Sequence, residues 1–192
     1  MGVIFQSLGR TVAASLVLVL LLALTLGNVP INHAWGAFVM RWMHVASGIM
    51  WVGLLWYFNF VQMPSMPKIP DEQKPAIGKV IAPAALFWFR WAALATVVTG
   101  LAVAGMNGYL VQALSLQRPF LAIGVGMWLA LLMAFNVWFI IWPNQKKALG
   151  IVTVPADEKA KAARMAMLTS RFNTMLSLPM LYAMVAQQNG GL

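Results

Sequence analysis

Five apolar runs, each close to 20 residues long, constrain what this chain can fold into more than any other feature. A helix of about 20 residues spans the hydrocarbon core of a bilayer. Of the 192 residues, 61% are hydrophobic and 9% are charged, whereas a soluble domain is about half apolar and about a quarter charged. The sequence therefore predicts an all-α integral membrane protein, a bundle of about five transmembrane helices. The predicted spans are residues 11–29, 38–63, 83–106, 119–142 and 170–187.

Prolines indicate where these helices should begin and end. The motif P-S-M-P at 64–67 and Pro143 are expected to end two spans, and the third span is expected to begin near Pro83. Pro179 should kink the last span. Pro155, followed by two acidic residues, is typical of a helix start.

The basic residues divide unequally between the two sides of this topology. Ten of the 13 Lys and Arg residues fall on one side, mainly in the loops 63–83 and 143–170. Because cytoplasmic loops are rich in basic residues, we expect a cytoplasmic N-terminus, an outside C-terminus and a location in the bacterial cytoplasmic (inner) membrane. This distribution also accounts for the net charge of +9, so no nucleic-acid partner is expected. Residues 1–37 should form an N-terminal anchor helix with an outer loop, and residues 38–192 a four-helix membrane domain.

The composition excludes several kinds of site. The chain contains no cysteine, which rules out disulfides, iron–sulfur clusters, thiolate zinc sites and covalently attached haem. Its four acidic residues all lie in the loops 63–83 and 143–170. Because ion-coupled carriers use carboxylates inside the membrane, a transporter or channel is a weak interpretation.

Polar side chains gather on one stripe of the span 38–63. At 100° per residue they fall within about 60° of His44. A charged side chain that faces lipid costs at least about 2.5 kcal/mol, so the stripe should face protein or a bound group. A glycine in its middle would let a helix or a flat ligand approach the backbone. The stripe consists of Arg41, His44, Gly48, Trp51, Asn59 and Gln62.

His44 is the candidate ligand for a metal, as an axial ligand to a non-covalent haem b. Arg41, one turn earlier, would pair with a haem propionate, while Gly48 and Trp51 would line the ring. The second axial ligand stays open between a methionine and His33, which is expected in a loop eleven residues earlier and would have to fold back. The alternative is a hydrogen-bonded interfacial histidine without a cofactor.

A second polar layer is expected near the cytoplasmic ends of the spans. It comprises Asn59, Gln62, Arg90, Asn136, Arg171 and Asn173. Two interpretations stay open: a basic, amide-lined pocket for an anionic or amide-bearing molecule, or hydrogen bonds between helices worth about 0.6 kcal/mol each. In the first, the catalytic candidates are His44, Asn59 and Arg90, and the substrate-binding candidates are Arg90, Asn136, Asn173 and Gln62. Thr96 and Thr99 are expected to bond their own backbone and are given no role.

Four segments of the sequence are typical of one known family. They are RWMHVASGIMWVGLLWYFNFVQ at 41–62, FWFRWAALATVVTG at 87–100, NVWFIIWPNQ at 136–145 and SRFNTMLSLPMLYAM at 170–184. In this order they resemble the membrane domain of the bacterial membrane-bound urate hydroxylases, the urate oxidase N-terminal family, over about residues 40–184. The resemblance implies a helical membrane domain that oxidises urate to 5-hydroxyisourate and passes electrons to a cytochrome c. In the full-length enzymes this cytochrome is a fused C-terminal domain.

Two classes of function stay open. Since the sequence contains no C-x-x-C-H motif, the first is a short urate-hydroxylase-like redox protein that uses a separate cytochrome c. The second is a non-catalytic small helical subunit that packs against a larger respiratory or photosynthetic membrane complex, as its tryptophan-rich surfaces would allow. The expected partners are therefore the lipid bilayer and either other membrane subunits or a cytochrome.

Overall fold

The computed structural model describes residues 2–27 and 31–191, and these residues form helices and connecting loops with no strand. The N-terminal helices are α1 (Gly2–Phe5) and α2 (Leu8–Leu26). They are followed by α3 (His33–Trp56), η1 (Tyr57–Gln62), α4 (Met63–Ser65), η2 (Met66–Lys68), α5 (Lys74–Ala76), η3 (Ile77–Ile81), α6 (Ala82–Met106), α7 (Leu110–Leu114), α8 (Leu121–Phe135), η4 (Asn136–Ile141), α9 (Trp142–Ala148) and α10 (Ala156–Asn189). Of these, η1, η3 and η4 are π-helical and η2 is a 3₁₀ helix.

Four helical stretches of the described chain are long and apolar enough to cross a membrane. They are Leu8–Leu26, His33–Lys68, Lys74–Met106 and Leu121–Ala148. The predicted all-α membrane fold is thereby confirmed. The fifth predicted span, 170–187, lies within α10, a 34-residue helix that is not among these four. The total of five spans and the orientation of the termini stay predictions.

The chain divides into two compact units, residues 1–36 and 37–192. In the first unit the hydroxyl of Thr11 donates to the carbonyl of Ile4 at 3.1 Å, which joins α2 to α1. None of the residues of α2 is buried, as suits a helix surrounded by lipid or by another protein. The predicted first span reached residue 29, whereas α2 ends at Leu26; residues 28–30 lie outside the described part of the chain.

Prolines do not limit the membrane helices in the way the sequence suggested. The expected ends at Pro64 and Pro143 are wrong, because these helices continue to Lys68 and Ala148. The expected start near Pro83 is wrong as well, because η3 and α5 already precede α6 without a break.

A π-helical segment ends two residues before each of these three prolines. A proline inside a helix lacks the N–H group, and its ring clashes with the carbonyl four residues earlier. That carbonyl belongs to the π segment in each case, as Phe139 of η4 does for Pro143. The wider i to i+5 turn moves the carbonyl aside, so the helix continues through the proline.

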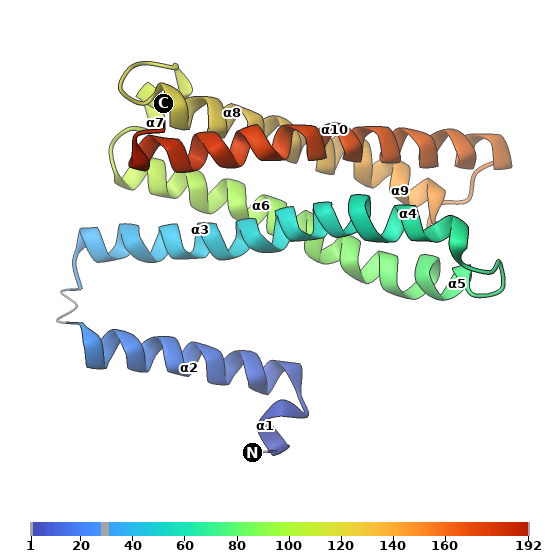
Figure 1. The fold of residues 1–192 in the computed structure, drawn as a ribbon, viewed down its shortest axis with the longest axis horizontal. Coiled ribbons are helices and arrows are strands. Elements are labelled where there is room, and N and C mark those ends of the chain that lie inside the picture. Colours follow the sequence, from blue (N-terminus) through green and yellow to red (C-terminus); the bar gives the residue numbers. More distant parts are fainter. Residues whose placement is uncertain (1, 28–30, 192) are drawn as a thin grey trace. The chain divides into compact units, whose positions relative to one another are not determined.

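Small residues let α10 pack closely along α8, η4 and α9 (Figure 1). The buried positions of α10 recur every three or four residues and are mostly alanine or serine, the residue types that allow helices to approach closely in membranes. They are Ala162, Ala166, Ser170, Asn173, Ser177, Met180, Ala183 and Ala186. A β-carbon at Gly126 of α8 would lie within 3.3 Å of the Ala183 side chain, which shows how close this contact is.

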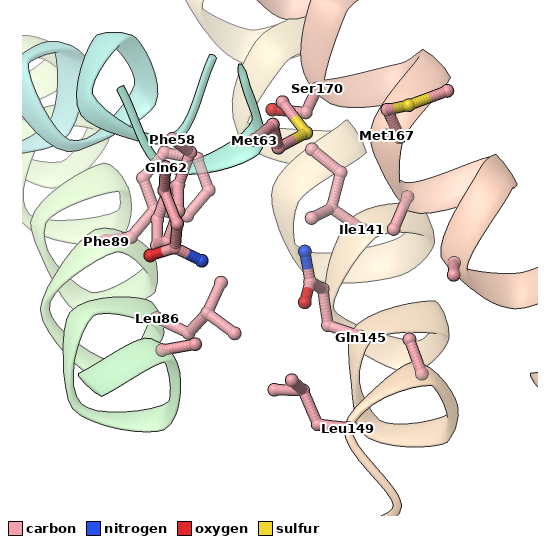
Figure 2. A pocket seen from close by; sticks show the side chains of 14 residues that line it. Phe58, Gln62, Met63, Leu86, Phe89, Ile141, Gln145, Leu149, Met167 and Ser170 are labelled. Atoms are coloured by element: carbon pink, nitrogen blue, oxygen red, sulfur yellow. The ribbon is translucent and has the colours of Figure 1, made fainter. Parts of the chain in front are cut away.

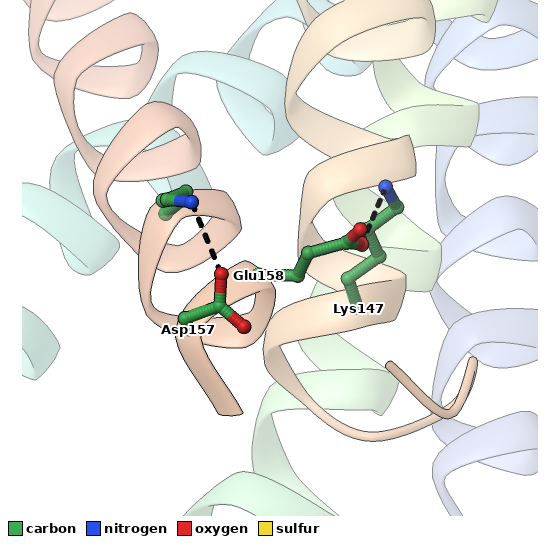
Figure 3. A network of polar contacts seen from close by, with 4 residues as sticks. Lys147, Asp157 and Glu158 are labelled. Carbon is green, nitrogen blue, oxygen red and sulfur yellow. Dashed lines mark hydrogen bonds and ion pairs between the residues drawn. The ribbon is translucent and has the colours of Figure 1, made fainter. Parts of the chain in front are cut away.

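The helix start predicted at Pro155 is confirmed, since α10 follows this residue and carries two acids in its first turn. Glu158 lies 3.6 Å from Lys147 at the end of α9, and Asp157 lies 3.1 Å from Lys161 one turn further along α10 (Figure 3). Exposed pairs of this kind contribute at most about 1 kcal/mol. They therefore orient the loop before α10 and add little to the stability of the bundle.

Substituting Gly124 with alanine should destabilise the protein. A β-carbon at this position of α8 would collide with the backbone carbonyl oxygen of Ala113 in α7. For Gly124→Ala we expect a loss of about 1–3 kcal/mol in the free energy of unfolding, measured by denaturant titration in detergent micelles. The control is Gly105→Ala, where a β-carbon meets nothing within 4 Å, so the effect should be close to neutral. Equal losses in the two variants would contradict the close approach of α7 and α8.

Candidate functional site

A groove of about 600 Å³ lies between α3, α6, α8 and α10, and we refer to it as the outer groove. Its α3 wall contains Arg41, His44, Gly48 and Trp51, the four residues that the sequence analysis assigned to a cofactor. The remaining lining is mostly apolar, as is usual for pockets in which a few polar groups orient a ligand. The structure therefore brings these four residues together on one side of a single space.

The imidazole of His44 is held by α6. Its Nδ1 lies 2.8 Å from the backbone carbonyl oxygen of Thr96, and because a carbonyl only accepts, Nδ1 carries the hydrogen. The lone pair of the ring is then on Nε2. Histidines that bind metals commonly donate their other ring N–H to a carbonyl in this way, which fixes the orientation of the ring. His44 can thus offer Nε2 as a ligand or as a base.

Gly100 makes room for this ring, and its role was not anticipated from the sequence. A β-carbon at Gly100 would lie 2.8 Å from Cε1 and 3.0 Å from Nδ1 of His44. The hydroxyls of Thr96 and Thr99 bond to carbonyls of their own helix, at 2.7 Å and 2.6 Å, as expected. What was missed is the main-chain carbonyl of Thr96. The sequence signal that could have indicated this contact is the four-residue spacing of Thr96 and Gly100, which places them on one face of α6.

Two tryptophans of α3 lie in the wall of the groove, and they differ in whether the indole N–H has a hydrogen-bond acceptor. Trp56 donates its indole N–H to the hydroxyl of Ser177 in α10 at 2.9 Å. The indole N–H of Trp51 is buried and has no acceptor among the described residues. A buried donor without a partner costs about 1–3 kcal/mol.

Tyr109 also lines the groove and was not anticipated from the sequence. Its ring stacks on Phe120 with 5.1 Å between the centroids. Burial raises the pKa of the Tyr109 hydroxyl, whereas the positive charge of Arg41 acts to lower it. The electrostatic influence of Arg41 therefore extends to this part of the groove.

These residues fit a non-covalent haem. His44 would hold the iron through Nε2, and Arg41 would pair with a propionate. Methionines in the α8 and α10 walls would offer sulfur atoms as a second ligand to the iron. They are Met127, Met180 and Met184. His33, expected in a loop, is instead the first residue of α3, and eleven residues of helix rise by about 16 Å, so the two histidines do not share one iron.

The inner polar residues do not converge on one pocket. Asn136 donates to the side-chain oxygen of Asn173 at 2.8 Å, and Asn173 donates to the carbonyl of Met133 at 2.9 Å. Both asparagines are buried. Asn59 donates to the hydroxyl of Ser170 at 2.8 Å. The amides of these three asparagines thus join η1, α8 and η4 to α10.

A smaller space of about 170 Å³, the inner cavity, lies between η1, α6, α9 and α10 (Figure 2). Figure 2 shows the amides of Gln62 and Gln145 projecting into it from opposite sides. The side-chain oxygen of Gln62 is buried and receives no hydrogen bond from the described residues. Among the described residues no charged side chain lines this cavity, which suits a neutral guest or water better than an anion.

The stripe predicted on the span 38–63 divides into two parts. The part up to Trp51 lines the outer groove, whereas Asn59 and Gln62 lie in η1. Because a π segment has more residues per turn than an α-helix, the spacing of 100° does not apply to them. Asn59 consequently meets α10, and Gln62 enters the inner cavity.

Arg90 lines neither the outer groove nor the inner cavity. Its guanidinium carbon lies 3.4 Å from the ring centre of Trp142 and 5.7 Å from that of Trp138. Arg171, the other base expected in this layer, is exposed on α10. The structure thus separates the inner basic residues from His44.

One comparison with known proteins gives a match. The sequence model of a family described as urate oxidase N-terminal matches residues 103–190, somewhat less than half of the chain. This segment is similar to the urate hydroxylase membrane domain. It includes α8, η4, α9 and α10, and with them two of the four segments that carried the predicted resemblance, which is confirmed over this range. No curated protein and no solved structure matches the chain significantly.

Removal of either buried asparagine should destabilise the bundle. Asn136→Ala or Asn173→Ala leaves a buried amide of the other residue without its partner, so each should cost about 1–3 kcal/mol of unfolding free energy. The double variant should cost less than the sum, because neither amide is then left unpaired. Denaturant titration in micelles measures all three.

The control is Asn144→Ala, whose amide bonds only to the Ile140 carbonyl of its own helix segment, and it should change stability little. Additive single effects would contradict the Asn136–Asn173 contact. Unchanged stability with weaker binding of a small molecule would instead assign these amides to a substrate.

Proposed function

We propose that the chain is a membrane-embedded redox protein of the urate hydroxylase type, with the outer groove as its redox centre. The observation that carries the proposal is the arrangement around His44, in which the Thr96 carbonyl fixes the ring and leaves Nε2 free within a space of about 600 Å³. The match of residues 103–190 supports the kinship, because this segment supplies the α8 and α10 walls of the same groove.

Each residue of the groove has a distinct part in this proposal. His44 holds the cofactor or takes a proton through Nε2, and Thr96 and Gly100 keep its ring in place. Arg41 binds a carboxylate of the cofactor or an anionic substrate. A haem bound there would supply one-electron transfer. The apolar walls from α8 and α10 exclude water from the reacting groups.

The reaction follows from the chemistry of urate. Conversion of urate to 5-hydroxyisourate adds the oxygen of one water molecule and releases two electrons and two protons. A separate cytochrome c, which accepts one electron at a time, would take these electrons in two steps. In this proposal the protein works in the bacterial cytoplasmic membrane, where the cytochrome reaches the groove from outside.

Haem binding should depend on His44 and be independent of His33. After expression with haem supplied, the purified wild-type protein should show a Soret absorption band. His44→Ala should lose the band, and the matched control His33→Ala should retain it, because His33 begins α3 at a distance of eleven residues. Absence of the band from the wild type would contradict haem binding. Equal bands in the wild type and in His44→Ala would show that His44 is not a ligand of the haem iron.

Urate-dependent reduction of cytochrome c should follow the same pattern. Membranes containing the wild-type protein should reduce about two molecules of cytochrome c for each urate consumed, as the two-electron chemistry requires, and His44→Ala should abolish this activity. Full turnover by His44→Ala would place the reaction elsewhere in the protein.

A second candidate function is supported by α2. None of the residues of this apolar helix is buried, which supports a contact with another membrane protein. In this alternative the chain is a non-catalytic subunit of a larger respiratory or photosynthetic complex. Native electrophoresis of mildly solubilised membranes distinguishes the two, since a subunit should migrate with the large assembly. Migration as a small free species would contradict the alternative.

A further inference from the structure

Arg90 carries a positive charge that the rest of the described chain does not neutralise. The protein has four acidic residues, and three of them pair with lysines. These pairs are Asp71–Lys74, Asp157–Lys161 and Glu158–Lys147. The Nε and Nη1 atoms of Arg90 are buried and have no acceptor among the described residues. An unpaired charge in a membrane-spanning helix is costly, and an anion from outside the chain would lower that cost.

Two tryptophans hold the guanidinium group in one orientation. Trp142 lies under it at 3.4 Å and Trp138 lies 5.7 Å away, both within the range of cation–π attraction. These contacts bury Nε and Nη1 but leave Nη2 less covered. Nη2 is therefore the guanidinium nitrogen that can donate to an oxygen atom of a bound anion such as a phosphate.

Lys146 brings a second positive charge to the same tryptophan. Its Nζ lies 5.6 Å from the ring centre of Trp142, and it too has no ion pair within the described residues. Lys146 belongs to α9, one turn beyond Trp142 and close to the loop that leads to α10. Bases from α6 and α9 therefore converge on one ring at the end of the bundle that carries the lysine-rich loops.

The surroundings of this pair favour a lipid over a soluble anion. Trp88 and Trp91, on either side of Arg90 in α6, are 56% and 47% exposed. Exposed tryptophans are typical of the level of the lipid headgroups, where their rings contact both the acyl chains and water. Arg90 lines neither of the two cavities, and the exposed tryptophans on both sides of it place this stretch of α6 at the surface that meets the bilayer.

We propose that Arg90, Trp142 and Lys146 form a binding site for the phosphate of an anionic phospholipid in the leaflet next to the basic loops. Arg90 donates from Nη2 to a phosphate oxygen, Lys146 adds a point charge, and Trp142 keeps the guanidinium in place. Basic pockets between helices on this side of a membrane are known to hold anionic headgroups. The site joins α6 to α9 through the lipid.

The test uses the full-length protein in a neutral detergent. Phosphatidylglycerol, phosphatidylcholine or inorganic phosphate is added at equal concentration, and native mass spectrometry and the melting temperature report binding. The wild type should retain phosphatidylglycerol and melt higher with it, and it should respond to neither of the other additions. In Arg90→Gln/Lys146→Gln the affinity for phosphatidylglycerol should fall by about tenfold or more.

Two further variants keep the outcome decisive. Arg164→Gln removes an exposed base of α10 and, like Lys146→Gln, one positive charge. It should bind phosphatidylglycerol as the wild type does. Lys146→Gln leaves the stack of Arg90 on Trp142 intact, so this variant should fold even if the double variant does not. Its affinity for phosphatidylglycerol should be lower than that of the wild type by about threefold or more.

Three results would overturn the proposal. The first is equal retention of phosphatidylglycerol by the wild type and the Lys146 variants, and the second is an equal loss in Arg164→Gln, which would indicate unspecific charge attraction. The third is stabilisation by inorganic phosphate as large as that by phosphatidylglycerol, which would assign the site to a soluble anion.

Discussion

The contact of α10 with α8, η4 and α9 is the interaction on which the rest of the structure depends. Apolar side chains gain nothing by leaving lipid for another helix, so helices in a bilayer are held by close packing and by hydrogen bonds. The buried face of α10 provides both, because it consists mostly of alanine and serine and carries Asn173, which bonds to Asn136. Ser170 and Ser177 on this face accept hydrogen bonds from η1 and α3, so α10 positions these helices as well.

The outer groove is a consequence of how α3 is attached. Side-chain hydrogen bonds hold it, from His44 to the Thr96 carbonyl of α6 and from Trp56 to Ser177 of α10. Between these two points a space of about 600 Å³ remains. The bond that fixes α3 is also the bond that orients the imidazole of His44. One interaction thus serves the fold and prepares the candidate site.

The other end of the bundle has a different chemistry. The π segments carry the helices through their prolines, and η1, η4 and the start of α6 frame the inner cavity with its two opposed glutamines. Arg90 of α6 lies outside this cavity and stacks on Trp142. The proposed redox chemistry and the proposed lipid site therefore use separate ends of the second unit and do not compete for the same residues.

The sequence by itself determined the membrane fold, because apolar runs of this length have no solvent but the bilayer, and it placed the polar residues around His44 on one face, because α3 is a regular helix there. It also located the start of α10 from its proline and acids. Only the tertiary structure decided what each polar group meets. The Thr96 carbonyl is a group that every residue carries, so no pattern of side chains marks it as the partner of His44. Asn136 bonds to Asn173, 37 residues further along the chain, and Arg90 stacks on Trp142. The spacing of residues along one helix does not distinguish between such partners, because they are selected by the packing of helices that are distant in the sequence.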